Sequence, residues 1–352
     1  MKKVLLFVTS IILSASVLAG CSSANNSVKA SGDSAIMDYD TITVVWYPNE
    51  SADAYKDTRD EICNVIAKAT GKKIEQKTTT DYSIAIESIA SGNGQIAFMG
   101  GQGYVEAHNK NAKILPLVVN TGASGTLTDA IYYSWLAVNK GTESEYQKDG
   151  KYTLDNIQGK KISYVSNSST SGFKVPTTNI ISYFSKQDKW KTLNADGLTE
   201  GGSNKLFKEV LFGQSHQGSA ANLLNGKADV AAFCDTSLAP YVEVETGKES
   251  SVGAVYKVKT GASDPFTKLV GKEFVLINST PVLNGPFAVN TGKLKADDIT
   301  KIQDALTGDT TTNDEKIFYI KGKSKGLIEK TKNEHFTKVD DSWYNPIREL
   351  SK

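Results

Sequence analysis

The side chains best suited to chemistry in this sequence form one run of hydroxyls, Ser168-Ser169-Thr170-Ser171, followed by Gly172. The run comes after a predicted strand, 161–165, and leads into a predicted helix. A helix N-terminus leaves main-chain N–H groups unpaired and carries a partial positive charge. Together with the hydroxyls, these groups can receive a phosphate-sized oxyanion. A polar turn with ample N-capping residues is the alternative interpretation.

The elements that position this cluster alternate between strand and helix. Short apolar, β-branched runs alternate with segments of helical periodicity, and the pattern restarts near residue 134. The predicted strands are 41–46, 73–78, 95–99, 135–138, 161–165, 209–211 and 228–234. This order predicts an α/β protein with two similar lobes, each built on a mostly parallel sheet flanked by helices. Ligands of such sheets gather beyond the carboxyl ends of the strands.

The N-terminus predicts where the protein works. Lys2 and Lys3 precede an apolar run that ends in Leu18-Ala19-Gly20-Cys21, a pattern typical of a secretory signal. The ending resembles the lipobox of bacterial lipoproteins, which implies a signal peptide over 1–20 and a lipid on Cys21. Residues 21–40 are then interpreted as the lipidated cysteine and a flexible tether, because 22–34 is rich in Ser, Asn, Ala and Gly. A signal that happens to end in cysteine is the alternative.

Composition excludes several classes of function. The chain carries 40 Lys and Arg against 39 Asp and Glu, so no basic excess favours nucleic acid. Beyond the signal, no apolar run is long enough to span a bilayer. Cys63 and Cys234 are interpreted as packing residues, with a disulfide between them unsupported. The three histidines form no H-x-x-x-H pair, so we expect neither a zinc site nor any cofactor.

A series of short motifs runs through residues 41–348. In order they are Asp81-Tyr82, Gly100-Gly101, Tyr132-Tyr133-Ser134, Ser169-Thr170-Ser171-Gly172 with Val175-Pro176, Gly213-x-Ser-His216, 225–231, Asn284-Gly285-Pro286 and 343–348. This series resembles the phosphate, phosphite and phosphonate receptors of bacterial ABC importers. The resemblance implies the type II periplasmic-binding-protein fold, with two α/β lobes, two crossing strands and a ligand in the cleft between the lobes.

The resemblance also implies a site. The hydroxyls and N–H groups of Ser169, Thr170 and Ser171, the phenols of Tyr82 and Tyr133 and an N–H of His216 would all donate to the oxyanion. A tetrahedral oxyanion offers mostly acceptors, so a tight site presents donors. Taken alone, Tyr82 and Tyr133 are also consistent with core residues whose hydroxyl groups reach solvent, and His216 is consistent with a capping role.

Two further positions bear on the ligand. Asp235 ends a predicted strand before Thr236, which favours an N-cap, although its carboxylate there also suits a protonated oxyanion or an ammonium. Receptors for aminoalkylphosphonates in the family place an acid where this chain has Gly285. Because a buried, unpaired ammonium is costly, we expect phosphite, phosphate or a small neutral alkylphosphonate rather than 2-aminoethylphosphonate.

The expected function is therefore an extracytoplasmic receptor, anchored to the membrane by its lipid, that closes on a phosphorus oxyanion and delivers it to an ABC permease. One lobe is expected from 41–133 plus 286–352 and the other from 134–285. A receptor of the same fold for a sulfonate or a thiamine precursor is one alternative. An enzyme with Cys63, Cys234 or a cleft serine as nucleophile is another, but no base is presented beside them and no Gly-x-Ser-x-Gly elbow occurs.

Overall fold

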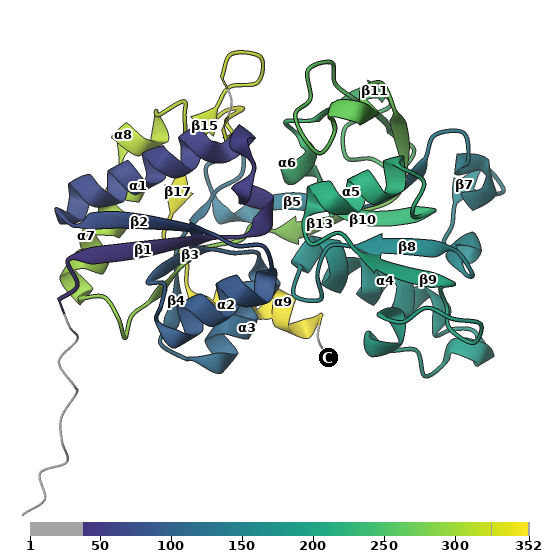
Figure 1. The fold of residues 1–352 in the computed structure, drawn as a ribbon, viewed down its shortest axis with the longest axis horizontal. Helices are drawn as coiled ribbons and strands as arrows, with labels where there is room; N and C mark the ends of the chain where they lie inside the picture. Colours follow the sequence, from purple (N-terminus) through teal and green to yellow (C-terminus); the bar gives the residue numbers. More distant parts are fainter. Residues whose placement is uncertain (1–37, 325, 351–352) are drawn as a thin grey trace, which may run out of the picture. The chain divides into compact units, whose positions relative to one another are not determined.

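The computed structural model describes residues 38–324 and 326–350. The predicted signal peptide, Cys21 and most of the predicted tether lie outside the described residues. Two large sheets flanked by helices form the body of the fold (Figure 1), with two small two-stranded sheets, β6 (Gln147–Lys148) with β7 (Lys151–Tyr152) and β15 (Phe318–Tyr319) with β16 (Ile328–Glu329). The expected α/β architecture is therefore confirmed.

The first sheet has six strands in the order β17-β4-β14-β3-β1-β2. Their bounds are β1 Thr41–Trp46, β2 Lys73–Thr78, β3 Ile96–Phe98, β4 Ile114–Asn120, β14 Phe287–Asn290 and β17 Phe336–Thr337. β1 pairs in parallel with β2 and β3, as strands joined through helices do. β14 runs antiparallel to β3 and β4, so the sheet is mixed.

Helices cover both faces of this sheet (Figure 1). On one face α1 (Lys56–Thr70) packs against α7 (Ala296–Thr307), and on the other α2 (Tyr82–Ser91) packs against α3 (Gly101–Lys110), with α9 (Asn345–Glu349) beside α3. The ends of α1 and α2 follow local rules. α1 stops at Gly71, whose φ of 72° suits glycine, and the Asp81 carboxylate caps α2 by accepting from the Ser83 N–H.

The second sheet has seven strands in the order β11-β12-β13-β5-β10-β8-β9. Their bounds are β5 Ile131–Asn139, β8 Lys161–Tyr164, β9 Glu209–Phe212, β10 Val230–Cys234, β11 Val242–Thr246, β12 Val255–Val258 and β13 Glu273–Leu283. Of the strand pairs described in this sheet, only β8–β9 and β8–β10 are parallel. The expectation of mostly parallel sheets therefore needs correction, because antiparallel pairs predominate in both large sheets. α4 (Val175–Phe184) packs in the core on one face, and α5 (His216–Leu224) with α6 (Asp235–Leu238) on the other.

The chain passes between the two sheets through neighbouring segments. It leaves the first sheet after β4, enters the second at β5, and returns between β13 and β14. β5 and β13 pair antiparallel from Ile131 opposite Leu283 to Asn139 opposite Phe274. Just beyond this ladder, the Asn284 N–H donates to the Ala130 carbonyl at 3.0 Å. These segments are where we propose that the lobe boundaries fall.

Short turns replace longer helices at several points of the chain. Residues 48–55 form two 3₁₀ turns, Pro48–Ser51 and Asp53–Tyr55, before α1 begins. Asp155–Ile157 is a single 3₁₀ turn, because the chain becomes extended at Gln158. The helix after the hydroxyl run starts as a wide π turn, Thr170–Lys174, before α4.

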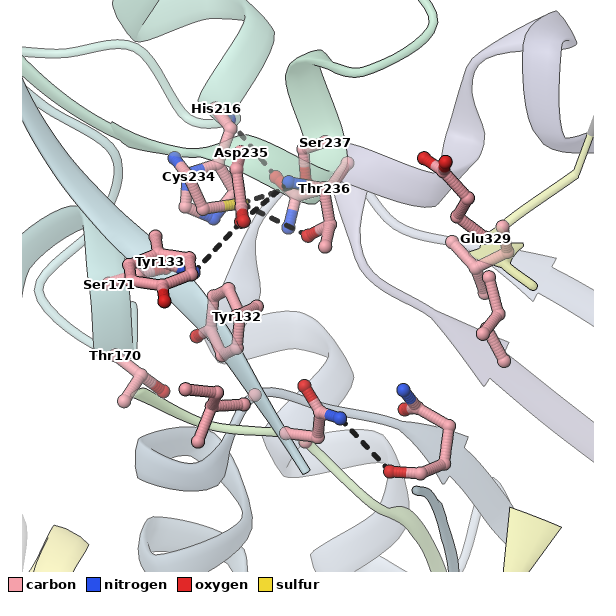
Figure 2. Close-up of a pocket in the computed structure, with 18 of the residues that line it drawn as sticks. Tyr132, Tyr133, Thr170, Ser171, His216, Cys234, Asp235, Thr236, Ser237 and Glu329 are labelled. Carbon is pink, nitrogen blue, oxygen red and sulfur yellow. Dashed lines mark hydrogen bonds between the residues drawn. The ribbon is translucent and has the colours of Figure 1, made fainter. Parts of the chain in front are cut away.

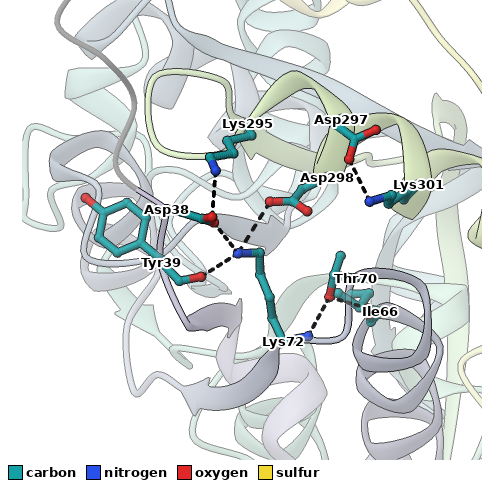
Figure 3. Close-up of polar contacts among 9 residues, drawn as sticks. All are labelled: Asp38, Tyr39, Ile66, Thr70, Lys72, Lys295, Asp297, Asp298 and Lys301. Carbon is teal, nitrogen blue, oxygen red and sulfur yellow. Dashed lines mark hydrogen bonds and ion pairs between the residues drawn. The ribbon is translucent and has the colours of Figure 1, made fainter.

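Ion pairs hold the first described residues against the first sheet (Figure 3). Lys72 Nζ lies 2.6 Å from Asp38 Oδ1 and 3.6 Å from Asp298 Oδ2, and Lys295 Nζ lies 2.6 Å from Asp38 Oδ2. Hydrogen bonds from Lys295 and Lys72 lower the pKa of Asp38 to about 2. Within the described residues, no helix has the length and apolarity needed to cross a membrane.

Candidate ligand-binding site

A cavity of about 570 Å³ lies at the strand ends and is lined by residues of both sheets (Figure 2). The residues just beyond the carboxyl ends of β1, β3 and β8 line this cavity, which is where an α/β fold is expected to bind its ligand. All seven residues expected from the sequence line it: Tyr82, Tyr133, Ser169, Thr170, Ser171, His216 and Asp235. Residues up to 153 positions apart in the chain are thus brought to one place.

The three consecutive hydroxyls have different surroundings. Ser169 Oγ accepts from the Gly172 N–H at 3.1 Å and so acts as the N-cap. Thr170 Oγ1 accepts from the Gln102 N–H, at the start of α3, at 2.9 Å. Ser171 Oγ is buried and has no hydrogen-bond partner among the described residues. Because the first two oxygens accept, their own protons remain available to donate.

His216 is the first residue of α5, and its ring is buried. Its Nδ1 lies 3.0 Å from the main-chain nitrogen of Cys234. A main-chain N–H can only donate, so Nδ1 accepts and the proton of the neutral ring sits on Nε2. Burial lowers the pKa of His216 to about 3, which keeps the ring neutral near pH 7. His216 is therefore built as a neutral Nε2–H donor.

Tyr82 begins α2 and stacks on Tyr47, with ring centroids 4.1 Å apart. Its Oη accepts from Asn49 Nδ2 at 2.6 Å. Burial raises the pKa of Tyr82 well above its usual value, so the phenol keeps its proton. Tyr133 lies on β5 beside Tyr132, and both line the cavity. Since neighbours on a strand alternate in direction, the two rings leave β5 on opposite sides (Figure 2).

The expected N-cap role of Asp235 needs correction. The N-cap position of α6 belongs to Cys234, because the helix already begins at Asp235, directly after strand β10 ends. Asp235 Oδ1 accepts from the N–H groups of Thr236, at 2.7 Å, and of Tyr133, at 3.0 Å. Burial raises the pKa of Asp235 to about 7. The carboxyl therefore ties α6 to β5 at the cavity wall.

Comparison with known proteins gives the family. Residues 44–344 match the family described as "ABC transporter, phosphonate, periplasmic substrate-binding protein". The chain belongs to this family. It is a family of transport receptors and not of enzymes, and the expected receptor class is confirmed.

Individual relatives of this phosphonate-receptor family are more distant. The "Phosphate-import protein PhnD" of Mycolicibacterium smegmatis is 28% identical over 200 residues, which are 56% of this chain and 56% of the relative. The chain thus matches just over half the length of that relative.

Two solved structures share the fold. A binding protein component of an ABC phosphonate transporter from Pseudomonas aeruginosa has a TM-score of 0.62 at 21% identity, covering 88% of this chain and 85% of that one. PhnD1 from Prochlorococcus marinus, in complex with methylphosphonate, has a TM-score of 0.60 at 15% identity, covering 88% and 97%.

Several residues that line the cavity were missed in the sequence. Asn49 and Glu50 follow β1, and the rule that ligands gather at strand ends is the signal that points to them. Glu50 is 5% exposed, and its Oε2 lacks a partner among the described residues. Burial raises the pKa of Glu50 to about 8.

Cys234 also lines the cavity, which its interpretation as a packing residue alone did not predict. Burial raises the pKa of its thiol to about 12, so the sulfur stays protonated, and Sγ donates to Ser237 Oγ at 3.3 Å. Cys63 lies buried in α1, and both cysteines are free. A protonated thiol is a poor nucleophile, in keeping with a receptor.

Gly285 lies in the cavity wall, where the structure explains why it is glycine. A Cβ at this position would overlap the carbonyl oxygen of Met99. No acidic side chain fits there without moving the backbone of the strand end beside it. Among residues 38–324 and 326–350, no cluster of His, Cys, Asp and Glu is placed to hold a metal ion.

Proposed function

We propose that this protein is the extracytoplasmic receptor of an ABC importer and binds a small phosphorus oxyanion, namely a phosphonate, phosphite or phosphate. The observation that carries the proposal is a buried set of neutral donors at one cavity. Ser171 Oγ is buried with no protein partner, and the buried His216 ring has its proton on Nε2. Tyr82 keeps its phenol proton beside them.

Neutral donors suit a tetrahedral oxyanion. Hydroxyls and N–H groups of fixed direction satisfy its acceptors, and exclusion of water from a buried site strengthens each bond. The start of the helical segment at Thr170 adds unpaired N–H groups and a partial positive charge. Within the described part of the cavity wall, no lysine or arginine takes part.

We propose that the two lobes close on the ligand. Hydrogen bonds that join elements of the two sheets around the cavity support this. Thr170 Oγ1 accepts from the Gln102 N–H, and Asn49 Oδ1 accepts from the His216 N–H at 3.1 Å. Tyr55 Oη donates to the Ser237 carbonyl at 3.3 Å. Domain closure about neighbouring crossing segments would make and break such bonds.

An ammonium-bearing phosphonate is a second candidate ligand. Gly285 offers no charge partner. Six acidic side chains of the described residues nevertheless line the same cavity: Glu50, Asp129, Asp235, Glu249, Glu329 and Glu334. The cavity volume of about 570 Å³ also exceeds what a bare phosphate group fills, leaving room for a substituent. A cation beside these carboxylates would offset their mutual repulsion.

We propose further that Cys21 carries a lipid and that the tether holds the body at the outer face of the cytoplasmic membrane, where the permease lies. Radiolabelled fatty acid supplied to cells would label the full chain. A Cys21→Ala variant that takes up the same label would contradict the anchor.

Calorimetric titration of the chain from residue 35 onward tests the function. The panel is phosphite, inorganic phosphate, methylphosphonate, 2-aminoethylphosphonate and sulfate. Tight binding of a phosphorus anion with sulfate ignored is the expected result. Preference for 2-aminoethylphosphonate would identify the carboxylates as specificity groups. If none of the five compounds binds, the result would favour the alternative, a receptor of the same fold for a sulfonate or a thiamine precursor.

A further inference from the structure

Asn49 lies between two of the ligand donors without being one of them. It belongs to the 3₁₀ turn Pro48–Ser51 after β1 and is 5% exposed. Its Nδ2 lies 2.6 Å from Tyr82 Oη, and its Oδ1 lies 3.1 Å from the main-chain nitrogen of His216. Its carbonyl oxygen accepts from Gln217 Nε2 at 3.1 Å. One short turn of the first sheet thus reaches both α2 and α5.

The chemistry of these atoms fixes the direction of each bond. The His216 N–H can only donate, so the oxygen of the Asn49 amide must face it. The amide nitrogen must then face Tyr82, and an NH₂ group can only donate. Tyr82 Oη is therefore an acceptor toward Asn49. Because the phenol has one proton, that proton must point away from Asn49 and is left for another acceptor. The Ser169 hydroxyl is within reach of it, and an anion bound at the hydroxyl run would be a stronger acceptor.

We propose that Asn49 is a positioning residue that holds the Tyr82 hydroxyl as a donor toward the bound anion. The inference rests on the proposed function, because the acceptor it supplies is an oxygen of the phosphorus oxyanion. The Asn49 amide oxygen also accepts from the main-chain N–H of His216, the first residue of α5. It thereby helps to place the His216 ring, whose Nε2–H is the donor to the anion. Asn49 thereby sets the polarity of one donor and the place of another, from opposite sides of the cavity.

A purely mechanical role makes a different prediction. If Asn49 only tied the turn after β1 to α5, its loss would weaken binding equally whether or not Tyr82 had a hydroxyl. If it acts through the Tyr82 proton, its loss matters only while that proton exists. A double-mutant cycle separates the two cases.

The cycle consists of Asn49→Ala, Tyr82→Phe and the double variant, titrated calorimetrically with methylphosphonate and with inorganic phosphate. We expect Asn49→Ala to weaken binding by about tenfold alone, the order of one hydrogen bond to a charged group, and by less than about twofold in the Tyr82→Phe background. Equal losses in the two backgrounds would overturn the proposal.

Gln217→Ala is the matched control, because the Gln217 side chain donates to the Asn49 carbonyl and the Ser237 carbonyl rather than to Tyr82. Its effect should be the same in both backgrounds. Dependence of the Gln217→Ala effect on the Tyr82 hydroxyl would mean that the coupling is a general property of the turn, and the specific role of Asn49 would fail.

A measurement without ligand separates failure of this inference from failure of the proposed function. In the ligand-free protein, Tyr82→Phe should move one side-chain amide proton of Asn49 upfield by NMR, because the bond to Oη is lost. An unmoved amide proton would overturn the positioning role whatever the ligand. If the wild type binds none of phosphite, phosphate, methylphosphonate and 2-aminoethylphosphonate, the proposed function fails, and the orientation of Tyr82 by Asn49 is then judged on this signal alone.

Discussion

The hydroxyl oxygen of Thr170 lies 2.9 Å from the main-chain nitrogen of Gln102. Thr170 belongs to the turn after β8 in the second sheet, and Gln102 to the first turn of α3, which covers the first sheet. The hydroxyl run therefore does more than face the cavity: it also accepts a hydrogen bond from a main-chain N–H at the start of a helix that packs on the other sheet.

Thr170→Val should therefore lose two interactions. We expect the affinity for methylphosphonate to fall by about 1.5–3 kcal/mol and the free energy of unfolding by about 1 kcal/mol, because a ligand donor and the acceptor for Gln102 both disappear. Titration and urea unfolding measure the two effects. Thr170→Ser, which keeps the hydroxyl, should bind nearly as the wild type does; a similar loss in both variants would point to packing instead.

Ser171→Ala should weaken binding by about 1.5–3 kcal/mol and leave the unfolding free energy unchanged or slightly higher. The reason is that Ser171 Oγ is buried and makes no hydrogen bond of good geometry within the described protein, although the Tyr132 hydroxyl lies near it, so its loss should cost little stability. Ser169→Ala is the contrasting variant, since its oxygen caps the helix, and should cost about 1 kcal/mol of stability. Destabilisation of Ser171→Ala to the same degree would contradict the assignment.

His216→Ala should also lose about 1.5–3 kcal/mol of affinity. Because the pKa of His216 is lowered to about 3, the ring donates as a neutral group throughout pH 5.5–8. The ratio of wild-type to variant affinity should then stay constant over that range, since ionisation of the ligand affects both proteins alike. A ratio that grows as the pH falls would show that an imidazolium binds.

Cys63→Ser, far from the cavity in α1, should leave binding intact.

Glu50→Gln should change how stability depends on pH. Burial raises the pKa of Glu50 from 4.5 to about 8 in the folded protein, so the folded state favours the protonated form. The wild type should lose stability as the pH rises from 4.5 through about 8, by up to about 4 kcal/mol. The variant should lack this loss. Urea unfolding at pH 5 and 8.5 measures it, with the exposed Glu87→Gln as control. Parallel pH profiles of Glu50→Gln and wild type would contradict a buried, unpaired carboxyl.

Gly285→Ala should destabilise the cavity wall. Its Cβ would overlap the Met99 carbonyl oxygen, and overpacking of this kind typically costs about 1–3 kcal/mol. The phosphonate affinity should fall with it, because Met99 and Gly100 line the same cavity. Gly197→Ala is a suitable control, since its nearest neighbour would lie at an ordinary 3.4 Å. If the free energy of unfolding of Gly285→Ala equals that of the wild type, the backbone around Met99 can move aside at little cost.

The sequence predicts the elements well where local rules decide them. β1 begins and ends where its apolar and β-branched residues do, and Gly71 and Asp81 mark helix ends through their own backbone and side-chain chemistry. The hydroxyl run could be found because its residue types and its place after a strand carry the signal. These features depend on neighbours within a few positions.

What the sequence does not reveal depends on contacts across the fold. The bond from the Cys234 N–H to His216 Nδ1, which decides the tautomer, joins residues of a strand and a helix that only folding brings together. Asn49 looks like an ordinary turn residue until Tyr82 and His216 are seen on either side of it. Asp235 has the residue type of an N-cap, but its second bond, to the Tyr133 N–H, is visible only in three dimensions.

The division of the donors between the two sheets has a consequence for release. Tyr82 comes from α2 of the first sheet, whereas Ser171 and His216 come from the second. The donors of either sheet alone would bind the anion weakly. High affinity at the proposed site would require donors from both sheets to contact the same anion at once, as in a chelate. A permease that pulled the two sheets a few ångströms apart would therefore discharge the anion without offering any competing group of its own.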